Sequence, residues 1–237
     1  MGETDFHIRR AEGLNDYLAC VDLQKKVWGY TDMEDLAAQP MLMIGDRFGG
    51  CVLVAQDSAG EFVGFSFAMP GWKAGKRLFW WSHMTAVVAS YRNRELGLAL
   101  KLRQRDEALA AGIDLIEWTF DPMQSLNAHF NLNKLGVIVR EYEENVYGYT
   151  SSPLHRGLPT DRVVAEWHLK EERPPERDRA QCIRIEIPAN LDELKRTDME
   201  SALRWQERVR IACQQHFREG YAITAFEKPF YLLTRYG

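Results

Sequence analysis

The stretch VVASYRNRELGLALKL, residues 87–102, decides the fold because it joins a long apolar strand to a helix. The run at residues 77–89 is almost continuously apolar, which is typical of a central strand covered on both faces. Leu98, Leu102 and Leu109 then fall on one face of a helix that Gly112 is placed to end. We therefore predict a strand, a short loop and a helix in direct succession.

The loop of this unit has the features of a phosphate site. Residues 94–99 fit the pattern R-x-x-G-x-A. A glycine such as Gly97 lets the backbone approach an anion closely, and the free N–H groups of a helix start point at it. Arg92 and Arg94 add positive charge at the same place. The pattern favours phosphate binding, although an arginine-rich helix start is also common as plain solvated surface.

Apolar periodicity predicts further elements on both sides of the loop. Before it we expect a strand at 6–11, helices at 14–28 and from Thr31 to a limit at Pro40, and a hairpin of residues 51–57 and 61–69. After it we expect strands at 113–120, 137–149 and 163–169, and a short helix at 125–136 closed by Gly136. This order indicates an α/β (α+β) protein whose mixed, mostly antiparallel sheet is flanked by helices. It argues against a doubly wound dinucleotide fold.

A charged, proline-bearing stretch, EERPPERDR at residues 171–179, is typical of a solvated connector. Beyond it, a strand at 183–188, a helix at 198–219 and two last strands predict a β-α-β-β extension. We expect three parts: a main domain at 1–170, the connector at 171–180, and the extension at 181–237 packed on the main domain.

Composition excludes several classes of protein. The net charge of -4 argues against broad attraction to nucleic acid or to an anionic membrane. No apolar run approaches the roughly 20 residues that span a bilayer, and the polar start lacks the apolar region of a signal peptide. The four cysteines lack metal-ligand spacing, which fits buried thiols in a reducing compartment. We expect a cytoplasmic protein without a metal.

Residues 88–99 resemble a segment of the GCN5-related N-acetyltransferases (GNAT), in which a strand ends in V-x-P-x-Y-R-G-x-G-x-G and the next helix start binds the pyrophosphate of coenzyme A. Glu95 replaces one customary glycine, so we expect a slightly different loop and a weaker anion field. In a second family signature, N-x-x-A-x-x-x-Y-x-x-x-G-F, Ala128 and Gly136 keep the spacing. Ser125 stands for the asparagine, and Leu132 stands for the tyrosine that often protonates the leaving thiolate.

The resemblance implies an acyl-CoA-binding site, with acetyl-CoA or another acyl-CoA as co-substrate. It implies that the backbone of residues 86–88 holds the pantetheine arm, with further contacts from the loop and the short helix. The implied cofactor-binding residues are Ala86, Val87, Val88, Arg92, Arg94, Glu95, Leu96, Gly97, Leu98, Ala99, Asn127 and Asn131.

Candidate catalytic residues follow from residue chemistry at these places. His83 has the most suitable intrinsic pKa for a base, with a hydrogen-bonded core histidine as the alternative. Glu117 needs a partner or a function in an apolar strand, or lies at an exposed edge. Asp121 is a third candidate base, with a turn role beside Pro122 as the alternative. His129 is a candidate to replace the missing tyrosine. Trp28, Tyr30 and Trp81 are candidates to line an apolar acceptor site, with core packing as the alternative.

The predicted function is transfer of an acetyl or succinyl group to the amine of a small molecule, such as an amino acid, by direct attack in a ternary complex. A second hypothesis is a degenerate GNAT domain that binds acyl-CoA as a sensor, which Glu95 and Leu132 favour. A third is an unrelated α+β protein that binds another phosphate ligand. A homodimer is left open.

Overall fold

The structure is a computed structural model that describes residues 5–73, 75, 77–148, 150–153, 157–170 and 182–236. The predicted connector at 171–180 lies outside the described residues. The chain forms two compact units, Met1–Glu117 with Thr150–Pro153, and Trp118–Tyr149 with Leu154–Gly237. The boundary therefore falls inside strand β5 (Leu115–Phe120). The predicted functional division into 1–170 and 181–237 stays a prediction.

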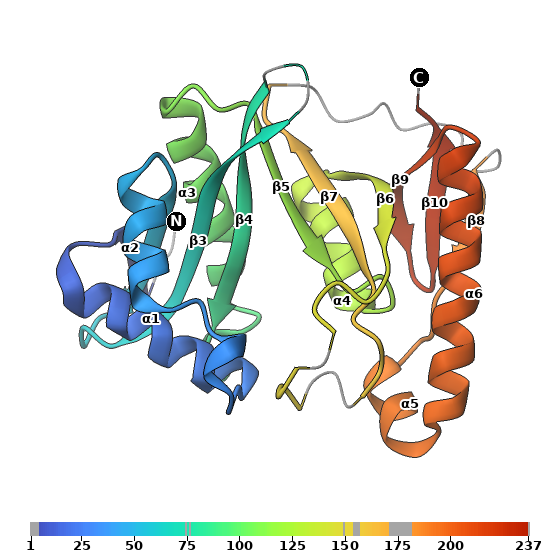
Figure 1. Ribbon diagram of the computed structural model, residues 1–237, viewed down its shortest axis with the longest axis horizontal. Helices are drawn as coiled ribbons and strands as arrows, with labels where there is room; N and C mark the ends of the chain where they lie inside the picture. Colours follow the sequence, from blue (N-terminus) through green and yellow to red (C-terminus); the bar gives the residue numbers. More distant parts are fainter. Residues whose placement is uncertain are drawn as a thin grey trace. The chain divides into compact units, whose positions relative to one another are not determined.

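The first unit contains a sheet in the order β1-β2-β3-β4, followed by the beginning of β5. Figure 1 labels β3, β4 and β5 of this sheet. The strand pairs up to β4 are antiparallel, and β4 and β5 are parallel. This part confirms the mixed, mostly antiparallel sheet. The elements are β1 (Phe6–Arg10), α1 (Gly13–Trp28), η1 (Met33–Asp35), α2 (Gln39–Arg47), β2 (Cys51–Asp57), β3 (Phe62–Lys73), β4 (Arg77–Val87), η2 (Ala89–Tyr91) and α3 (Leu96–Ala110).

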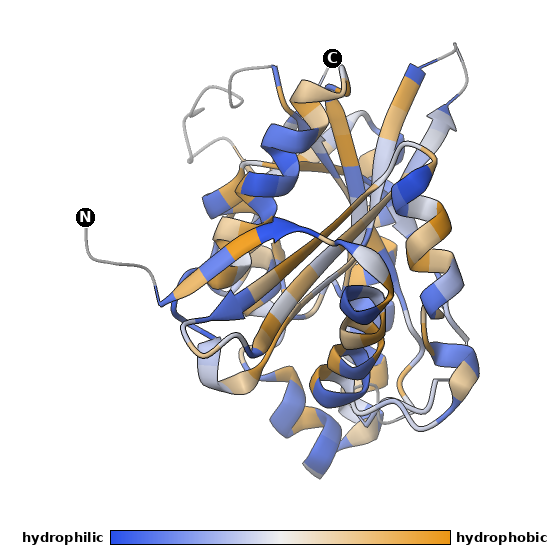
Figure 2. Ribbon diagram, turned by 90° about the vertical axis from the view of Figure 1, so that its left-hand side faces the viewer, coloured by the Kyte–Doolittle hydropathy of each residue, from blue (hydrophilic) through white to orange (hydrophobic). Residues whose placement is uncertain are grey.

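The helices of the first unit cover both faces of its sheet. Phe65 and Phe67 of β3 are buried in a cluster with residues of α1 and α2. The alternate residues, Gly64 and Ser66, meet α3 on the opposite face, where Gln104 donates to Ser66 at 2.6 Å. Figure 2 shows the mixed colouring of the helices and the apolar stretches of the strands. The central strands are therefore buried on both faces, as their continuous apolar sequence predicts.

The prediction for Pro40 was wrong. Pro40 does not limit a helix that starts at Thr31, because it occupies the first turn of α2, where its missing N–H costs no helical hydrogen bond. The residues before it form the short turn η1 and an irregular connector. Gln24 fixes the end of this connector, since its side chain bonds both the N–H and the C=O of Ala37 at 2.8 and 3.1 Å.

The second unit has the strand order β7-β6-β9-β10-β8, with the end of β5 preceding β7 (Figure 1). The C-terminal extension is present and contains an additional helix, α5, that the sequence analysis missed. The predicted strand at 137–149 is shorter, since β6 ends at Glu143. The elements are α4 (Ser125–Ala128), the π-helix η3 (His129–Leu135), β6 (Ile138–Glu143), β7 (Arg162–His168), β8 (Ile183–Glu186), α5 (Leu191–Thr197), α6 (Met199–Arg218), β9 (Tyr221–Glu227) and β10 (Phe230–Arg235).

A buried carboxylate connects the extension to the rest of the second unit. Asp161 is 1% exposed and accepts hydrogen bonds from Tyr142 Oη at 2.7 Å, Asn145 N at 3.0 Å and Arg210 Nη2 at 2.8 Å. Arg210 comes from α6, so the extension supplies the counter-charge that a buried carboxylate requires.

We predict that Gly64→Ala destabilises the protein, whereas Gly97→Ala does not. A Cβ at Gly64 would lie 2.8 Å from the carbonyl oxygen of Ala86, and 3.3 and 3.4 Å from Leu100 and Leu96 of α3. Overpacking of this kind costs about 1–3 kcal/mol. A Cβ at Gly97 would meet a methyl group of Val87 at 3.9 Å, an ordinary contact. Urea unfolding of both variants measures the difference, and equal stability would contradict close packing of α3 on β3.

Candidate functional site

The start of α3 presents unbonded backbone donors. The first helical hydrogen bond runs from Ala99 N to Glu95 O at 2.9 Å, so the N–H groups of Leu96, Gly97 and Leu98 lie in the first turn, ahead of the helical ladder. Gly97 leaves open space, because the nearest heavy atom to a Cβ there is 3.9 Å away. Packing therefore does not require this glycine, whereas close approach of a ligand to the backbone would.

The loop before α3 keeps a backbone that favours glycine. Asn93 and Glu95 have positive φ angles of 62° and 61°. Asparagine tolerates this region because its short side chain bonds locally, but glutamate adopts it at a cost. Glu95 therefore occupies a glycine-like conformation, and it also adds a carboxylate beside the helix start.

The arginines of the loop supply positive charge. The Arg94 side chain is 56% exposed, and its guanidinium lies 5.3 Å from the ring centre of Tyr91 and 3.7 Å from Asp5. Arg92 Nε donates to the carbonyl of Val87 at 3.4 Å, which directs it back toward the end of β4. The cation, the helix start and the open glycine together form the arrangement that a phosphate group requires.

The sheet pairing of β4 shows which backbone N–H groups of residues 86–88, the predicted contacts of the pantetheine arm, are already bonded. Val88 N donates to Val63 O at 3.0 Å within the sheet. Successive N–H groups of a strand alternate in direction, so Ala86 also points toward β3 and Val87 points away from it. Val87 is therefore the residue of the three whose N–H can serve a ligand.

His83 occupies an irregular position in β4. Ser82 pairs with Ala68 and Met84 with Phe67, so His83 is the extra residue of a β-bulge, a feature that redirects a side chain. Its ring contacts Phe67 edge-on, with centroids 6.2 Å apart. Among the described residues the imidazole makes no hydrogen bond, and its role as a base stays a prediction. Burial lowers the pKa of His83, so the ring is neutral near pH 7.

The predicted acceptor residues Trp28 and Tyr30 lie on the same face of the sheet as His83. Trp28 meets Phe65 edge-on at 6.3 Å, and Phe65 is two residues from Phe67 on β3. Tyr30 packs against Trp28 at 5.9 Å. Both aromatic rings are half-buried. The structure therefore brings two of the predicted acceptor residues and the predicted base to one face of the first unit.

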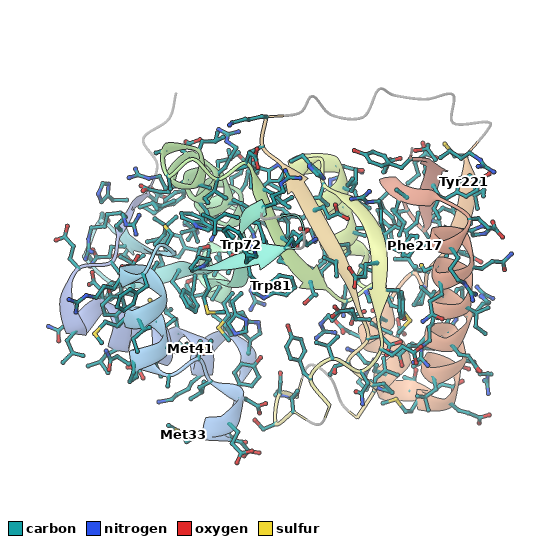
Figure 3. The ribbon with its side chains drawn as sticks, turned by 45° about the horizontal axis from the view of Figure 1, so that its top comes forward. Met33, Met41, Trp72, Trp81, Phe217 and Tyr221 are labelled. Carbon is teal, nitrogen blue, oxygen red and sulfur yellow. The ribbon has the colours of Figure 1, made fainter. Side chains whose placement is uncertain are left out.

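The tryptophans of β4 have different environments. Trp80 is buried, and its Nε1 donates to Gly49 O at 2.8 Å, so it is a core residue. Trp81 is half-buried and is labelled in Figure 3. Its part in acceptor binding stays a prediction.

The predicted base Glu117 is buried, at 1% exposure, so the alternative of an exposed edge was wrong. It forms an ion pair with Lys73 of β3. This partner accounts for a carboxylate inside an apolar strand without any catalytic role.

The remaining predicted residues belong to the second unit and are described within it. Asn131 is buried and accepts from Trp118 Nε1 at 3.3 Å, which gives it a structural contact. His129 is exposed, and its Nδ1 lies 3.1 Å from Asn133 Nδ2. Asn127 is exposed on α4, and Leu132 is 3% exposed, so leucine fills the tyrosine position as a core residue.

Two further residues of this unit bear on acid–base chemistry. Burial raises the pKa of Asp121, whose Oδ1 accepts from Met123 N at 2.8 Å in a turn. This contact matches the turn role that the sequence analysis gave as the alternative. Burial, followed by the hydrogen bond to Asp161, raises the pKa of Tyr142 well above its usual range. Tyr142 is therefore a weaker acid than an ordinary tyrosine, and its hydroxyl proton is already donated to Asp161.

A buried lysine escaped the sequence analysis. Lys101 of α3 is 4% exposed, and its Nζ lies 2.8 Å from Ser82 Oγ, next to the bulge at His83. Burial lowers the pKa of Lys101 to about 7. The sequence feature that could have revealed this buried lysine is its position between Leu100 and Leu102, on the face of α3 that packs on the sheet.

Within the described ranges, no group of three or more histidine, cysteine, aspartate or glutamate side chains could hold a metal ion. None of the helices described is both long and apolar enough to cross a membrane.

Solved structures with the same fold are acetyltransferases of the GNAT family. One is an acetyltransferase of the GNAT family from Streptococcus pneumoniae, with a TM-score of 0.53, 16% identity and coverage of 68% of this chain and 98% of that chain. The aminoglycoside 6'-acetyltransferase type Ii has a TM-score of 0.53, 19% identity and coverage of 71% and 99%. The protein yncA of Salmonella typhimurium, solved with acetyl-CoA, has a TM-score of 0.53, 19% identity and coverage of 73% and 99%.

No protein-family model matches the sequence, and no curated protein does. The structural matches show that the chain has the GNAT superfamily fold, as the segment at 88–99 predicts. Since they cover about 70% of the chain, a further portion of it lies beyond the common fold.

We predict that Arg94→Ala together with Gly97→Asp lowers affinity for coenzyme A by about 100-fold or more, because it removes a cation and places a carboxylate at an anion site. The matched control is Arg105→Ala with Ala110→Asp, which makes the same charge change at exposed or half-exposed positions further along α3. Calorimetric titration measures both variants. Equal affinity in a folded double variant would exclude the start of α3 as the phosphate site.

Proposed function

We propose that this protein is an acyl-CoA-dependent N-acyltransferase that moves an acetyl or succinyl group to the amine of a small molecule, such as an amino acid. The observation that carries the proposal is the start of α3, where Gly97, the first-turn N–H groups and Arg94 form an anion site directly after the central strand. The GNAT fold supports it, since a structure with this fold was solved with acetyl-CoA.

The residues of the first unit fit the parts that this reaction needs. The pyrophosphate of coenzyme A would lie on the N–H groups of residues 96–98, with Arg94 beside it. The N–H of Val87 would bond the pantetheine arm, because it points away from β3. Trp28 and Tyr30 would contact the acceptor on the face that also carries His83.

The chemistry is attack of a neutral amine on the thioester carbonyl carbon. A new C–N bond forms, the C–S bond breaks, and the amine loses a proton while the thiolate gains one. His83 is the group we assign to the amine proton, because its lowered pKa keeps it ready to accept a proton near pH 7. Holding both reactants in the right geometry would lower the activation barrier by several kcal/mol more.

The tyrosine that usually donates the proton to the thiolate is replaced by Leu132. Leu132 carries no proton to give, and Tyr142 bonds to the buried Asp161. We assign this proton to water, and His129 is the alternative that residue chemistry predicts.

A second candidate function is a domain that binds acyl-CoA without turnover. Two observations favour it: Glu95 places a carboxylate at the anion site, and Leu132 removes the usual acid. This candidate predicts binding of coenzyme A at the start of α3 with no release of thiol.

We predict amine-dependent release of free thiol from acetyl-CoA or succinyl-CoA, with kcat falling as the pH drops below a pKa under 6.5. The direction follows from the lowered pKa of His83. The ring gains a proton only in this acidic range, and the protonated ring cannot act as a base. His83→Gln should remove this pH dependence and slow the reaction by about 100-fold or more. The control is His7→Gln, at an exposed histidine of β1.

A thiol assay over a panel of amines and pH values measures both effects. Coenzyme A binding without thiol release from any amine would favour the binding domain. Turnover with an unchanged pH profile in His83→Gln would exclude His83 as the base.

A further inference from the structure

The connector between α1 and α2, residues 29–38, is held by a distant segment of the chain. Residues 150–153 belong to the first unit although they lie 116–124 positions from their partners in the sequence. They contact Trp28, the last residue of α1, and several residues of the connector from Gly29 to Asp35. The connector itself contains only the short turn η1 as regular structure among its described residues.

Ser151 holds residues 31–35 of the connector. Its Oγ accepts from the backbone N–H groups of Thr31 and Asp32 at 3.1 and 3.2 Å and donates to the carboxylate of Asp35. The backbone N–H of Ser151 donates to the same carboxylate oxygen at 2.7 Å. One serine therefore bonds three residues of the connector.

Ser152 and Pro153 fix its beginning. Ser152 is 4% exposed, and its Oγ donates to the carbonyl of Trp28, the last residue of α1, at 2.8 Å. A carbonyl at this position has no partner within its own helix. Pro153 packs on Gly29, where a Cβ would lie 3.2 Å from two atoms of the proline ring. The end of α1, and with it the direction of the chain into Tyr30, depends on these contacts.

We infer that Ser151 and Ser152 are positioning residues for the acceptor end of the site. This inference rests on the proposed function. The two serines hold the backbone that carries Trp28 and Tyr30, the aromatic pair on the same face as His83. The serines bond the backbone on both sides of this pair. They make no contact with the start of α3 among the described interactions, so acyl-CoA binding does not depend on them.

The test compares Ser151→Ala, Ser152→Ala and Ser151→Thr, which keeps the hydroxyl. Ser201→Ala is the matched control, because Ser201 also bonds an aspartate, Asp198, through both its N–H and its Oγ. We expect the two alanine variants to raise KM for the amine about tenfold and to leave KM for acyl-CoA unchanged. Ser151→Thr should restore the amine KM, and Ser201→Ala should leave both constants unchanged.

Amide hydrogen exchange tests the positioning without any enzyme activity. In Ser151→Ala, the N–H groups of Thr31 and Asp32 should exchange at least about tenfold faster, while those of α3 keep their rates. Faster exchange without an effect on the amine KM would overturn the assignment of the acceptor end, and unchanged exchange would overturn the positioning role itself. Failure of the proposed function would appear separately, as loss of turnover in the unmodified protein.

Discussion

The close packing of α3 on β3 is the contact on which the candidate site depends. Gly64 allows it, because any side chain there would meet the backbone of β4 and the leucines Leu96 and Leu100. The contact places the first turn of α3 directly behind the end of β4. Gly97, on the same helix, leaves open space instead of a packed contact. One glycine thus brings the helix to the sheet, and the other leaves its donors accessible.

The two faces of the first unit separate two kinds of chemistry. On the α3 face, hydrogen bonds connect buried polar groups, including Lys101, Ser82 and Gln104. On the opposite face, apolar and aromatic residues of α1, α2 and β3 form a cluster, and Phe67 of this cluster contacts His83. Burial disfavours the protonated form of this imidazole, so the ring is neutral near pH 7. The bulge links the faces, since Ser82 bonds Lys101 and the next residue is His83.

Much of the fold was predictable, because it rests on long periodic segments. The apolar run of β4 and Gly136 at a helix end each correspond to an observed feature. The helix predicted after the loop is α3, but its predicted apolar face was wrong. Leu98 and Leu102 are half-buried and Leu109 is exposed, whereas the buried face of α3 carries Leu96, Leu100 and Ala108. The prediction for Pro40 was wrong because a proline breaks the interior of a helix but is also common in its first turn. The strand at 137–149 was overextended, since apolar residues continue past Glu143 into a loop.

The candidate site was predictable only in part. The pattern of Arg94 and Gly97 indicated the anion site. The sequence could not reveal that the N–H of Val88 donates to the carbonyl of Val63 within the sheet. The partner of Glu117 was equally hidden, because Lys73 lies 44 residues away. Ser151 and Ser152 carry no sequence signal at all, since their partners are backbone groups brought near by the fold.

The most direct test of the central claim is calorimetric titration of the protein with coenzyme A, acetyl-CoA, succinyl-CoA and ATP. The account predicts binding of a coenzyme A species with a Kd on the order of micromolar and no comparable binding of ATP. The tightest thioester would then identify the acyl donor. Absence of coenzyme A binding, or a preference for ATP, would contradict the assignment of the start of α3 as an acyl-CoA site.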